Sequence, residues 1–353
     1  SVSEAEVGDD IILVTDKTTF YAESGGQAGD KGTIETESGV VSINSVTKTN
    51  DGKWRHIGTV IHGSVSTGEK ATMTVDRQGR LASERNHSAT HLLQKALRMV
   101  LGEHVHQAGS SVTPERLRFD FNHMQAMTKE EIRAVENIVN DAVYNGYDVT
   151  TRILPIDEAK KLGAMALFGE KYGKVVRVVD IEGWSTEFCG GTHVKNTAQI
   201  GGFKIVSESS VAAGIRRIEA VTGRNLLIRA NMQEAMLHNV ANTLKANNVT
   251  ALPVRAEAVM AENKAMSKEL EELKAKIAAS KVDSLFDNAE EADGVKIASA
   301  YFTGTTGDTL RGMCDSIRDK AVNPVVAVLV GKAEDKITMA VTVNKLAQEK
   351  GLK

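Results

Sequence analysis

Two short motifs, about a hundred residues apart, carry imidazole and thiol side chains at the same spacing. His87 and His91 are four residues apart, and so are Cys189 and His193. Three imidazoles and one thiolate form a donor set that suits a tetrahedral zinc ion. If one ion binds all four side chains, the two motifs must meet in space. This requirement constrains the fold more than any other feature of the sequence.

The first motif lies in a predicted helix and the second in a tight loop. Residues 81–101 contain no proline and carry apolar side chains at helical spacing, namely Ala89, Leu92, Leu93, Ala96, Leu97 and Val100. His87 and His91 then lie one turn apart, roughly opposite that stripe. In residues 184–193, two adjacent glycines let the chain turn tightly enough for Cys189 and His193 to face one point. Each segment is therefore expected to supply two ligands.

Each half of this donor set has another interpretation when taken alone. Two histidines four residues apart are most often a solvated helix face, and a Cys near a His can be a nucleophile pair. A zinc peptidase is poorly supported, because Ser88 stands where the HExxH motif has its glutamate. The combination favours zinc. Four protein ligands close a tetrahedral site, which is typical of structural zinc, so the sequence leaves open whether the metal is catalytic.

Composition limits the class of protein. The chain has 353 residues, of which 41% are apolar and 25% charged, so two or three domains are expected. No apolar run approaches the ~20 residues of a membrane-spanning helix, and no signal peptide is recognised. Its two cysteines, Cys189 and Cys314, suit a reducing cytoplasm, with Cys314 as a small buried hydrophobe. A net charge of −3 gives no global argument for nucleic-acid binding.

Local patterns predict an α+β protein with four parts. Residues 1–75 contain short β-branched runs and suit a small β-barrel or a curled sheet. Residues 76–225 alternate helix and strand and form the zinc-containing α+β domain. Residues 226–288 are helical with a break at 247–250, which we interpret as an antiparallel hairpin spacer. Residues 289–353 form a small α/β unit that stops where a new helical pattern begins, as in a truncated domain.

Within the second part, several elements have clear boundaries. Alternating residues predict strands at 107–112 and 117–121, and Val175 to Val179 predicts a buried strand. A capping box at residues 128–131 predicts the start of a helix, and another helix is expected near Asp157.

A locally basic region follows the second ligand motif. Arg216, Arg217 and Arg224 are the arginines of this region that we expect to hold a phosphate backbone, because guanidinium groups match phosphate geometry. The alternative is an ordinary solvated surface.

Four motifs together resemble one family. They are Phe20-Tyr21 through Ser24-Gly25-Gly26-Gln27, His87-x-x-x-His91, Cys-Gly-Gly-Thr-His at 189–193 and Gly-Ile-Arg-Arg-Ile-Glu-Ala at 214–220. In this order they resemble the editing half of bacterial alanyl-tRNA synthetases, and the resemblance covers essentially the whole chain. The zinc-bearing part is also similar to free-standing alanyl-tRNA editing proteins and to the editing domain of threonyl-tRNA synthetase.

The resemblance implies hydrolysis of serine or glycine wrongly esterified to the alanine-accepting tRNA, with zinc as the cofactor. It also implies a C-terminal domain, residues 289–353, that binds tRNA and aids homodimer formation, and a partner aminoacylation core that lies outside this chain. No phosphate-loop pattern or class II ATP site is recognised here. The glycine-rich stretch typical of the family's C-terminal domain is also absent, which weakens the expectation of tRNA binding there.

Selectivity requires a pocket that accepts serine and rejects alanine. A site that hydrogen-bonds the serine hydroxyl does this, because alanine leaves its polar groups unpaired. Thr90 and Gln107 are the first choices for this role and Thr18 and Gln27 the second, although each could equally be an ordinary surface or capping residue. The non-enzymatic alternative is a tRNA-binding module with a structural zinc.

Overall fold

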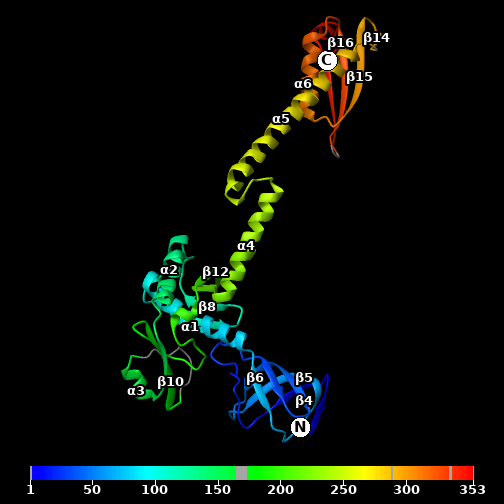
Figure 1. Cartoon of the computed structure of the whole chain (residues 1–353). Helices are drawn as coiled ribbons and strands as arrows, with labels where there is room; N and C mark the ends of the chain where they lie inside the picture. The colour runs from blue at the N-terminus through cyan, green and yellow to red at the C-terminus, as the bar shows by residue number, and fades with distance from the viewer. Residues whose placement is uncertain (1, 164–172, 288, 334–335, 353) are drawn as a thin grey trace. The chain divides into compact units, whose positions relative to one another are not determined.

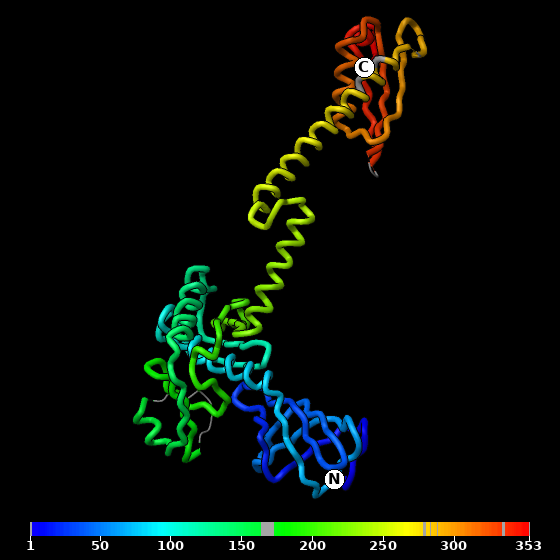
Figure 2. The backbone as a smooth tube through the Cα atoms, in the orientation of Figure 1, coloured from blue at the N-terminus to red at the C-terminus, as the bar shows by residue number. Residues whose placement is uncertain are grey.

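The computed structural model describes residues 2–163, 173–287, 289–333 and 336–352. The chain divides into two compact units, Ser1–Glu234 and Ala235–Lys353. Figures 1 and 2 follow it from the N-terminal strands in blue to the C-terminal strands in red. Both units combine helices with sheets, which confirms the predicted α+β class. Among the helices in the described ranges, none is long and apolar enough to cross a membrane.

The first unit begins with an antiparallel sheet of short strands. They are β1 (Glu4–Glu6), β2 (Asp10–Leu13), β3 (Gly32–Glu35), β4 (Gly39–Lys48), β5 (Trp54–Ser66) and β6 (Thr72–Val75). The pairing order is β1-β5-β4-β3-β6, and β2 also pairs with β5. Val41 and Ile43 alternate inward along β4 and share a core with Ile34 and Val60.

The barrel-like closure predicted for residues 1–75 is wrong, because this sheet is open. In the part of the chain that the structure describes, β6 pairs with β3 and has no pairing with β1 or β2. A barrel needs its two edge strands to hydrogen-bond with each other. The strands at the two ends of the order, β1 and β6, have three and four residues. Each of them pairs with one neighbour only.

Helix α1 (Arg77–Leu101) is the long element on which the first unit packs. The Asp76 side chain accepts hydrogen bonds from the backbone N–H groups of Gln78 and Gly79 and so caps the first turn. Of the predicted apolar stripe, the side chains that are fully buried are Ala89, Leu92, Leu93, Ala96 and Leu97. The other side of the helix is covered as well, since His87 and His91 are each only 6% exposed.

A four-stranded antiparallel sheet lies against α1. Its strands are β7 (Gln107–Val112), β8 (Leu117–Asn122), β12 (Phe203–Ala212) and β13 (Ile215–Thr222), in the order β12-β13-β8-β7. Phe119, Phe121 and Ile218 from this sheet share one core with α1 and with α2 (Lys129–Asn145). Helix α2 begins at the predicted capping box, formed by Thr128 and Glu131.

A three-stranded antiparallel sheet leads into the second ligand motif. It contains β9 (Val149–Pro155), β10 (Val175–Ile181) and β11 (Ser185–Phe188), in the order β11-β10-β9. Strand β10 confirms the strand predicted at residues 175–179, although its burial is only partial: Val176, Val178 and Val179 are buried and Val175 is exposed. Helix α3 (Ile156–Lys161) confirms the helix predicted near Asp157. Because β11 ends at Phe188, the next residue, Cys189, starts the loop at the end of a β-hairpin.

Two helices and a short 3-10 turn follow the first unit's sheets. They are α4 (Gly223–Thr243), η2 (Val249–Ala251) and α5 (Leu252–Leu285). The predicted break at 247–250 is confirmed, since the Asn248 side chain caps η2 there, and Pro253 lies in the first turn of α5. The antiparallel packing of the two helices stays a prediction.

The second unit ends in a four-stranded sheet. Its elements are β14 (Glu290–Ala292), β15 (Val295–Thr303), α6 (Gly307–Lys320), β16 (Val325–Ala333), β17 (Lys336–Val343) and the short helix α7 (Lys345–Glu349). The strand order is β14-β15-β16-β17, with β15 and β16 parallel and α6 between them in sequence. Cys314 on α6 lies in the core of this unit, as predicted for a small buried hydrophobe. The division into four domains, at 1–75, 76–225, 226–288 and 289–353, stays a prediction.

Candidate metal centre and adjoining cavity

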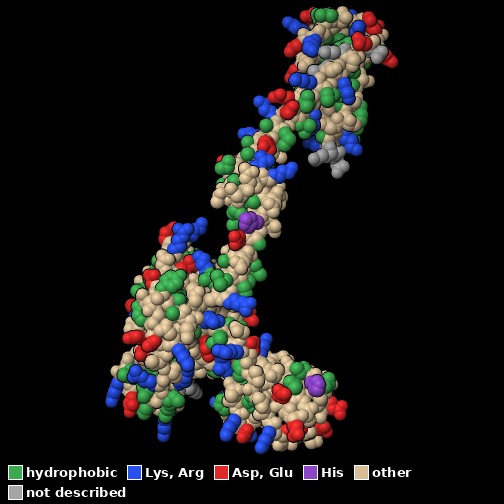
Figure 3. All heavy atoms as spheres, viewed as in Figure 1, with side chains coloured by type: hydrophobic (Ala, Val, Ile, Leu, Met, Phe, Trp, Pro, Cys, Tyr) green, Lys and Arg blue, Asp and Glu red, His purple; other side chains and the backbone are tan. Residues whose placement is uncertain are grey.

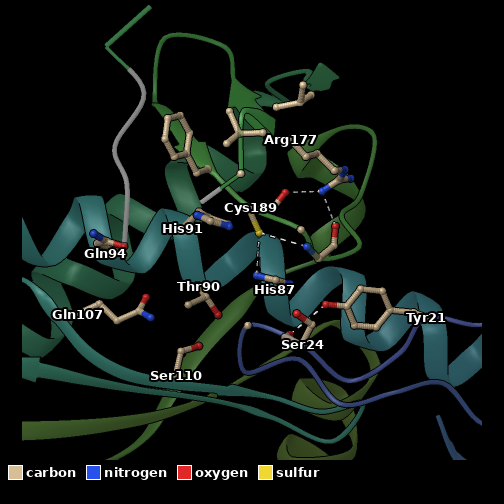
Figure 4. Close-up of a pocket in the computed structure, with 17 residues that line it drawn as sticks. Tyr21, Ser24, His87, Thr90, His91, Gln94, Gln107, Ser110, Arg177 and Cys189 are labelled. Atoms are coloured by element: carbon tan, nitrogen blue, oxygen red, sulfur yellow. Dashed lines mark hydrogen bonds between the residues drawn. The ribbon is translucent and has the colours of Figure 1, made fainter. Parts of the chain in front are cut away.

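The two ligand motifs meet in the folded chain. His87 and His91 project from α1, while Cys189 and His193 come from the loop that follows β11, and Figure 4 shows part of this cluster. One potential ligand atom from each residue lies within 4.8 Å of the others. Sγ of Cys189 is 3.4 Å from Nε2 of His87 and 3.2 Å from Nε2 of His193. These four residues could therefore hold one metal ion, and the donor set is compatible with zinc.

The two helix histidines are oriented by oxygen atoms that can only accept a hydrogen bond. Nδ1 of His87 lies 2.7 Å from the amide oxygen of Gln27, and Nδ1 of His91 lies 2.6 Å from a carboxylate oxygen of Glu187. Both Nδ1 atoms must therefore carry the proton. When such a ring is neutral, as metal binding requires, its lone pair is on Nε2, the atom that faces the cluster. Such outer partners are typical of metal-binding histidines.

The third histidine has the same arrangement. Nδ1 of His193 lies 3.1 Å from Oγ of Ser88, which directs its Nε2 toward Cys189. Within the described residues, Nε2 of His91 is buried and has no hydrogen-bond partner. A buried ring nitrogen without a partner is costly unless a ligand satisfies it. This unpaired nitrogen is the observation on which the fit of a metal ion rests.

The charges around the cluster favour a thiolate. Burial alone would raise the pKa of Cys189, but the neighbouring His87 and His193 outweigh it and hold this pKa well below its usual value. Burial and the charge of His87 lower the pKa of His193 to about 3. Burial also acts to lower the pKa of His91, yet the Glu187 carboxylate and the Cys189 thiol hold it well above its ordinary value. A thiolate is the form of Cys that binds metals.

Hydrogen bonds from Arg177 and close packing against His87 fix the ligand loop. One guanidinium nitrogen of Arg177, on β10, donates to the carbonyl oxygens of Cys189 and Gly191 at 2.8 and 2.7 Å. Gly191 packs directly on a ligand, because a Cβ built there would lie 2.1 Å from a ring carbon of His87. A Cβ at the preceding residue, Gly190, would meet no atom within 4 Å. Glycine is therefore required at 191 for steric reasons.

A cavity of about 260 Å³ adjoins three of the four ligands, His87, His91 and Cys189. Thr90 and Gln107 both line it, so the structure places the two first-choice substrate residues beside the cluster. The Thr90 hydroxyl donates to the backbone carbonyl of Asn86 at 2.8 Å. Its oxygen is therefore left with lone pairs and can only accept a hydrogen bond from a ligand.

Five polar residues of the cavity wall were not proposed as substrate residues from the sequence, namely Tyr21, Ser24, Gln94, Ser110 and Arg177. Gln94 follows Thr90 by one helical turn, so the i, i+4 rule pointed to it. Tyr21 and Ser24 belong to one of the four motifs of the resemblance, whereas Ser110 and Arg177 carry no comparable signal. The packing of the N-terminal loop on β7 brings Ser24 and Ser110 to the cavity wall. Gly26 marks that contact, since a Cβ at this position would lie 2.5 Å from the carbonyl oxygen of Ser110.

The two second-choice residues do not line this cavity. Gln27 is fully buried, and its amide is bonded to Thr192 as well as to His87. Thr18 bonds Nε2 of His56 at 2.7 Å within the N-terminal sheet region. Both side chains are used inside the protein, so neither is free to meet a substrate in the cavity.

Two of the three predicted tRNA-binding arginines are held in ion pairs. Arg216 donates two hydrogen bonds to Glu208, at 2.5 and 2.7 Å, and Arg217 donates two to Asp120, at 2.7 and 2.8 Å. Arg224 is exposed and lines a separate groove together with Arg85. Figure 3 shows acidic and basic side chains interspersed on the face in view. Arg216 and Arg217 each commit two N–H donors and their charge to a carboxylate, which leaves less for a phosphate group.

Comparison with known proteins shows what this chain is similar to. Residues 176–219, which include Cys189 and His193, match the model of the threonyl and alanyl tRNA synthetase second additional domain, and residues 1–79 match the class II (A) tRNA synthetase model. Alanine–tRNA ligases of Clostridioides difficile (strain 630), Acetivibrio thermocellus and Bacillus subtilis (strain 168) are 46%, 47% and 45% identical over 351 residues, 99% of this chain. The chain is homologous to one part of alanine–tRNA ligase.

The chain spans 40% of the length of these relatives. The match to the second additional domain model covers the ligand loop but ends before α4 and α5. The expectation that the aminoacylation core lies outside the chain stays a prediction.

Proposed function

We propose that this chain hydrolyses the ester that joins serine or glycine to the 3′ end of the tRNA for alanine. The observation that carries the proposal is the four-residue ligand cluster beside a cavity with polar side chains in its wall. Homology to alanine–tRNA ligase and the match to the second additional domain support tRNA as the partner. A homodimer, the ligase core as a partner and a cytoplasmic location belong to the same proposal.

The reaction adds a water oxygen to the ester carbonyl carbon. The bond from that carbon to the ribose oxygen then breaks, and the ribose oxygen takes up a proton, giving free amino acid and uncharged tRNA. The chain holds His87, His91, Cys189 and His193 as the ligands. A bound zinc ion would supply positive charge that polarises a carbonyl or lowers the pKa of a water molecule to about 7.

The cavity wall determines which amino acid is accepted. Serine differs from alanine by one hydroxyl, and a site that bonds this hydroxyl rejects the molecule that lacks it, because its own polar groups would stay unpaired. The Thr90 oxygen offers an acceptor, and the amide of Gln107 offers a donor and an acceptor in the same cavity. We assign these two residues to the amino-acid side of the site.

One observation favours a second candidate function. The four protein ligands fill a tetrahedral shell, and closed shells are typical of structural zinc. In that alternative the ion fixes the Cys189 loop against α1, and the chain binds tRNA without hydrolysing it. The two functions differ in whether amino acid is released.

The test uses the zinc-loaded chain with seryl-, glycyl- and alanyl-tRNA for alanine, measured side by side against buffer alone. We expect release of serine and glycine and little release of alanine. Removal of zinc by a chelator, or Cys189→Ala, should abolish the release. Binding of all three tRNAs with no release above the buffer rate would establish the structural-zinc alternative instead.

A further inference from the structure

Gln94 has a mostly buried side chain whose amide group makes no hydrogen bond to the described residues. It lies on α1, one turn beyond Thr90, and is only 8% exposed. Its side chain lines the cavity beside the ligand cluster. Across the described ranges of the chain, its amide group has no recorded hydrogen-bond partner. The amide nitrogen and oxygen are not closed off from solvent, so they are open to the cavity, where a ligand or a water molecule can bond them.

The contrast with Gln27 shows that this chain can satisfy a buried glutamine when its role is internal. The Gln27 oxygen accepts from Nδ1 of His87 and from the backbone N–H of Thr192, and its NH₂ group donates to the Thr192 hydroxyl. Gln94 has none of these internal bonds, although it is nearly as buried. Its amide is therefore available to a ligand in the cavity and does not stabilise the fold through a hydrogen bond.

The position of Gln94 indicates which part of a substrate it would meet. In Figure 4, Gln94 and Gln107 lie on one side of the ligand cluster, while Tyr21 and Ser24 lie on the other. All four line the same cavity. An aminoacyl ester with its carbonyl beside the cluster can place its amino-acid side chain at the glutamine end and its ribose at the end near Tyr21.

We propose that Gln94 is a specificity-determining residue that hydrogen-bonds the side-chain hydroxyl of the esterified amino acid. The inference rests on the proposed function and adds a residue to its site. An amide offers both a donor and an acceptor without charge, which matches a hydroxyl group. The Thr90 oxygen can only accept, so Gln94 supplies the complementary donor. Glycine lacks the hydroxyl and gains nothing from this contact.

The test compares hydrolysis of seryl-tRNA and glycyl-tRNA by the zinc-loaded chain and by Gln94→Met, which keeps the length of the side chain and removes its polarity. We expect the seryl-tRNA rate to fall about tenfold more than the glycyl-tRNA rate, the size expected for one lost hydrogen bond in a dry site. Zinc content and melting temperature are measured on both proteins. The matched control is Asn140→Leu, which removes an amide that bonds the backbone of Glu136 and Phe203 away from the cavity.

A second readout does not depend on turnover. Non-hydrolysable seryl and glycyl amides of 3′-amino-3′-deoxyadenosine are titrated into each protein by calorimetry, and Gln94→Met should lose affinity for the seryl compound selectively. Equal losses for the seryl and glycyl compounds would overturn the hydroxyl assignment and point to recognition of the shared amino group. If Gln94→Met is active and keeps the wild-type ratio of seryl-tRNA to glycyl-tRNA hydrolysis, the role of Gln94 is overturned while the proposed function stands. No hydrolysis by the unaltered chain would overturn the proposed function and this inference with it.

Discussion

The amide oxygen of Gln27 lies 2.7 Å from Nδ1 of His87, which follows it by sixty residues. The same oxygen accepts from the backbone N–H of Thr192 at 2.9 Å, and the amide nitrogen donates to the Thr192 hydroxyl at 2.9 Å. One side chain from the N-terminal segment thus fixes a ligand of α1 and the ligand loop together. Gln27 is a positioning residue for the metal centre.

Replacement of Gln27 should weaken metal binding. We expect Gln27→Leu to lower zinc affinity by about 10- to 100-fold, the range seen when an outer partner of a metal ligand is lost. Gln27→Glu should keep most of the zinc affinity, because a carboxylate can accept hydrogen bonds from His87 and from the backbone N–H and hydroxyl of Thr192. Competition with a chromophoric chelator measures the affinity, and the cobalt spectrum reports the ligand geometry. If Gln27→Leu keeps wild-type affinity while the metal-free protein melts earlier, the role of Gln27 is only structural.

Adjacent glycines in the ligand loop should respond very differently to alanine. Gly191→Ala places a methyl group against the His87 ring, whereas the methyl group of Gly190→Ala meets no atom within 4 Å. An overpacked site of this kind costs about 1–3 kcal/mol, so Gly191→Ala should lower zinc affinity by roughly tenfold or more. Gly190→Ala is the control and should bind zinc normally. Similar affinities for the two variants would show that the loop shifts freely, contrary to the close packing described.

Replacing Arg217 on β13 and replacing Arg224 on α4 should have different effects on tRNA binding. Among the described residues Arg224 has no recorded ion-pair partner, so Arg224→Ala should reduce the log–log salt slope of tRNA binding by roughly one. Arg217→Ala should leave the slope unchanged and lower the melting temperature, because its guanidinium already pairs with the buried Asp120. Binding isotherms at several salt concentrations measure the slope. A reduced slope for Arg217→Ala would return that residue to the phosphate-binding role.

His56 should make the first unit less stable in mild acid. Burial lowers the pKa of His56 below the ordinary histidine value of 6.5. As the pH falls below 6.5, His56 binds a proton in the unfolded chain but stays neutral in the folded chain. The folded state therefore loses stability until the pH reaches the lower pKa that His56 has in the folded state. His56→Asn, which keeps a donor for the Leu13 carbonyl, should flatten the melting temperature against pH between pH values of about 7 and 5. Parallel curves for the two proteins would assign the acid sensitivity to other groups.

Local patterns in the sequence predicted most of the elements and the main cluster. Helical spacing located α1, and the capping box located the start of α2. The four residues of the cluster were predictable because only a few residue types bind zinc and because each pair has a short, regular spacing. These features depend only on residues that are close together in the sequence.

Features that depend on long-range pairing were not predictable. Arg217 stands directly opposite Asp120 across β13 and β8, a register that no local pattern reveals, and this pairing is what neutralises it. The partners of Gln27 follow it by 60 and 165 residues. The open edge at β6 likewise depends on which strands pair, so alternation alone could not distinguish a barrel from a sheet.

The separation of the ligands along the chain has a consequence for biosynthesis. His193 is added to the growing polypeptide 102 residues after His91. At roughly 5–20 residues per second, translation places about 5 to 20 seconds between them. During that interval α1 has left the ribosome with only half of the donor set. A metal ion captured then would be held by two imidazoles, and the selective four-donor site forms only when the β11 hairpin docks on the helix.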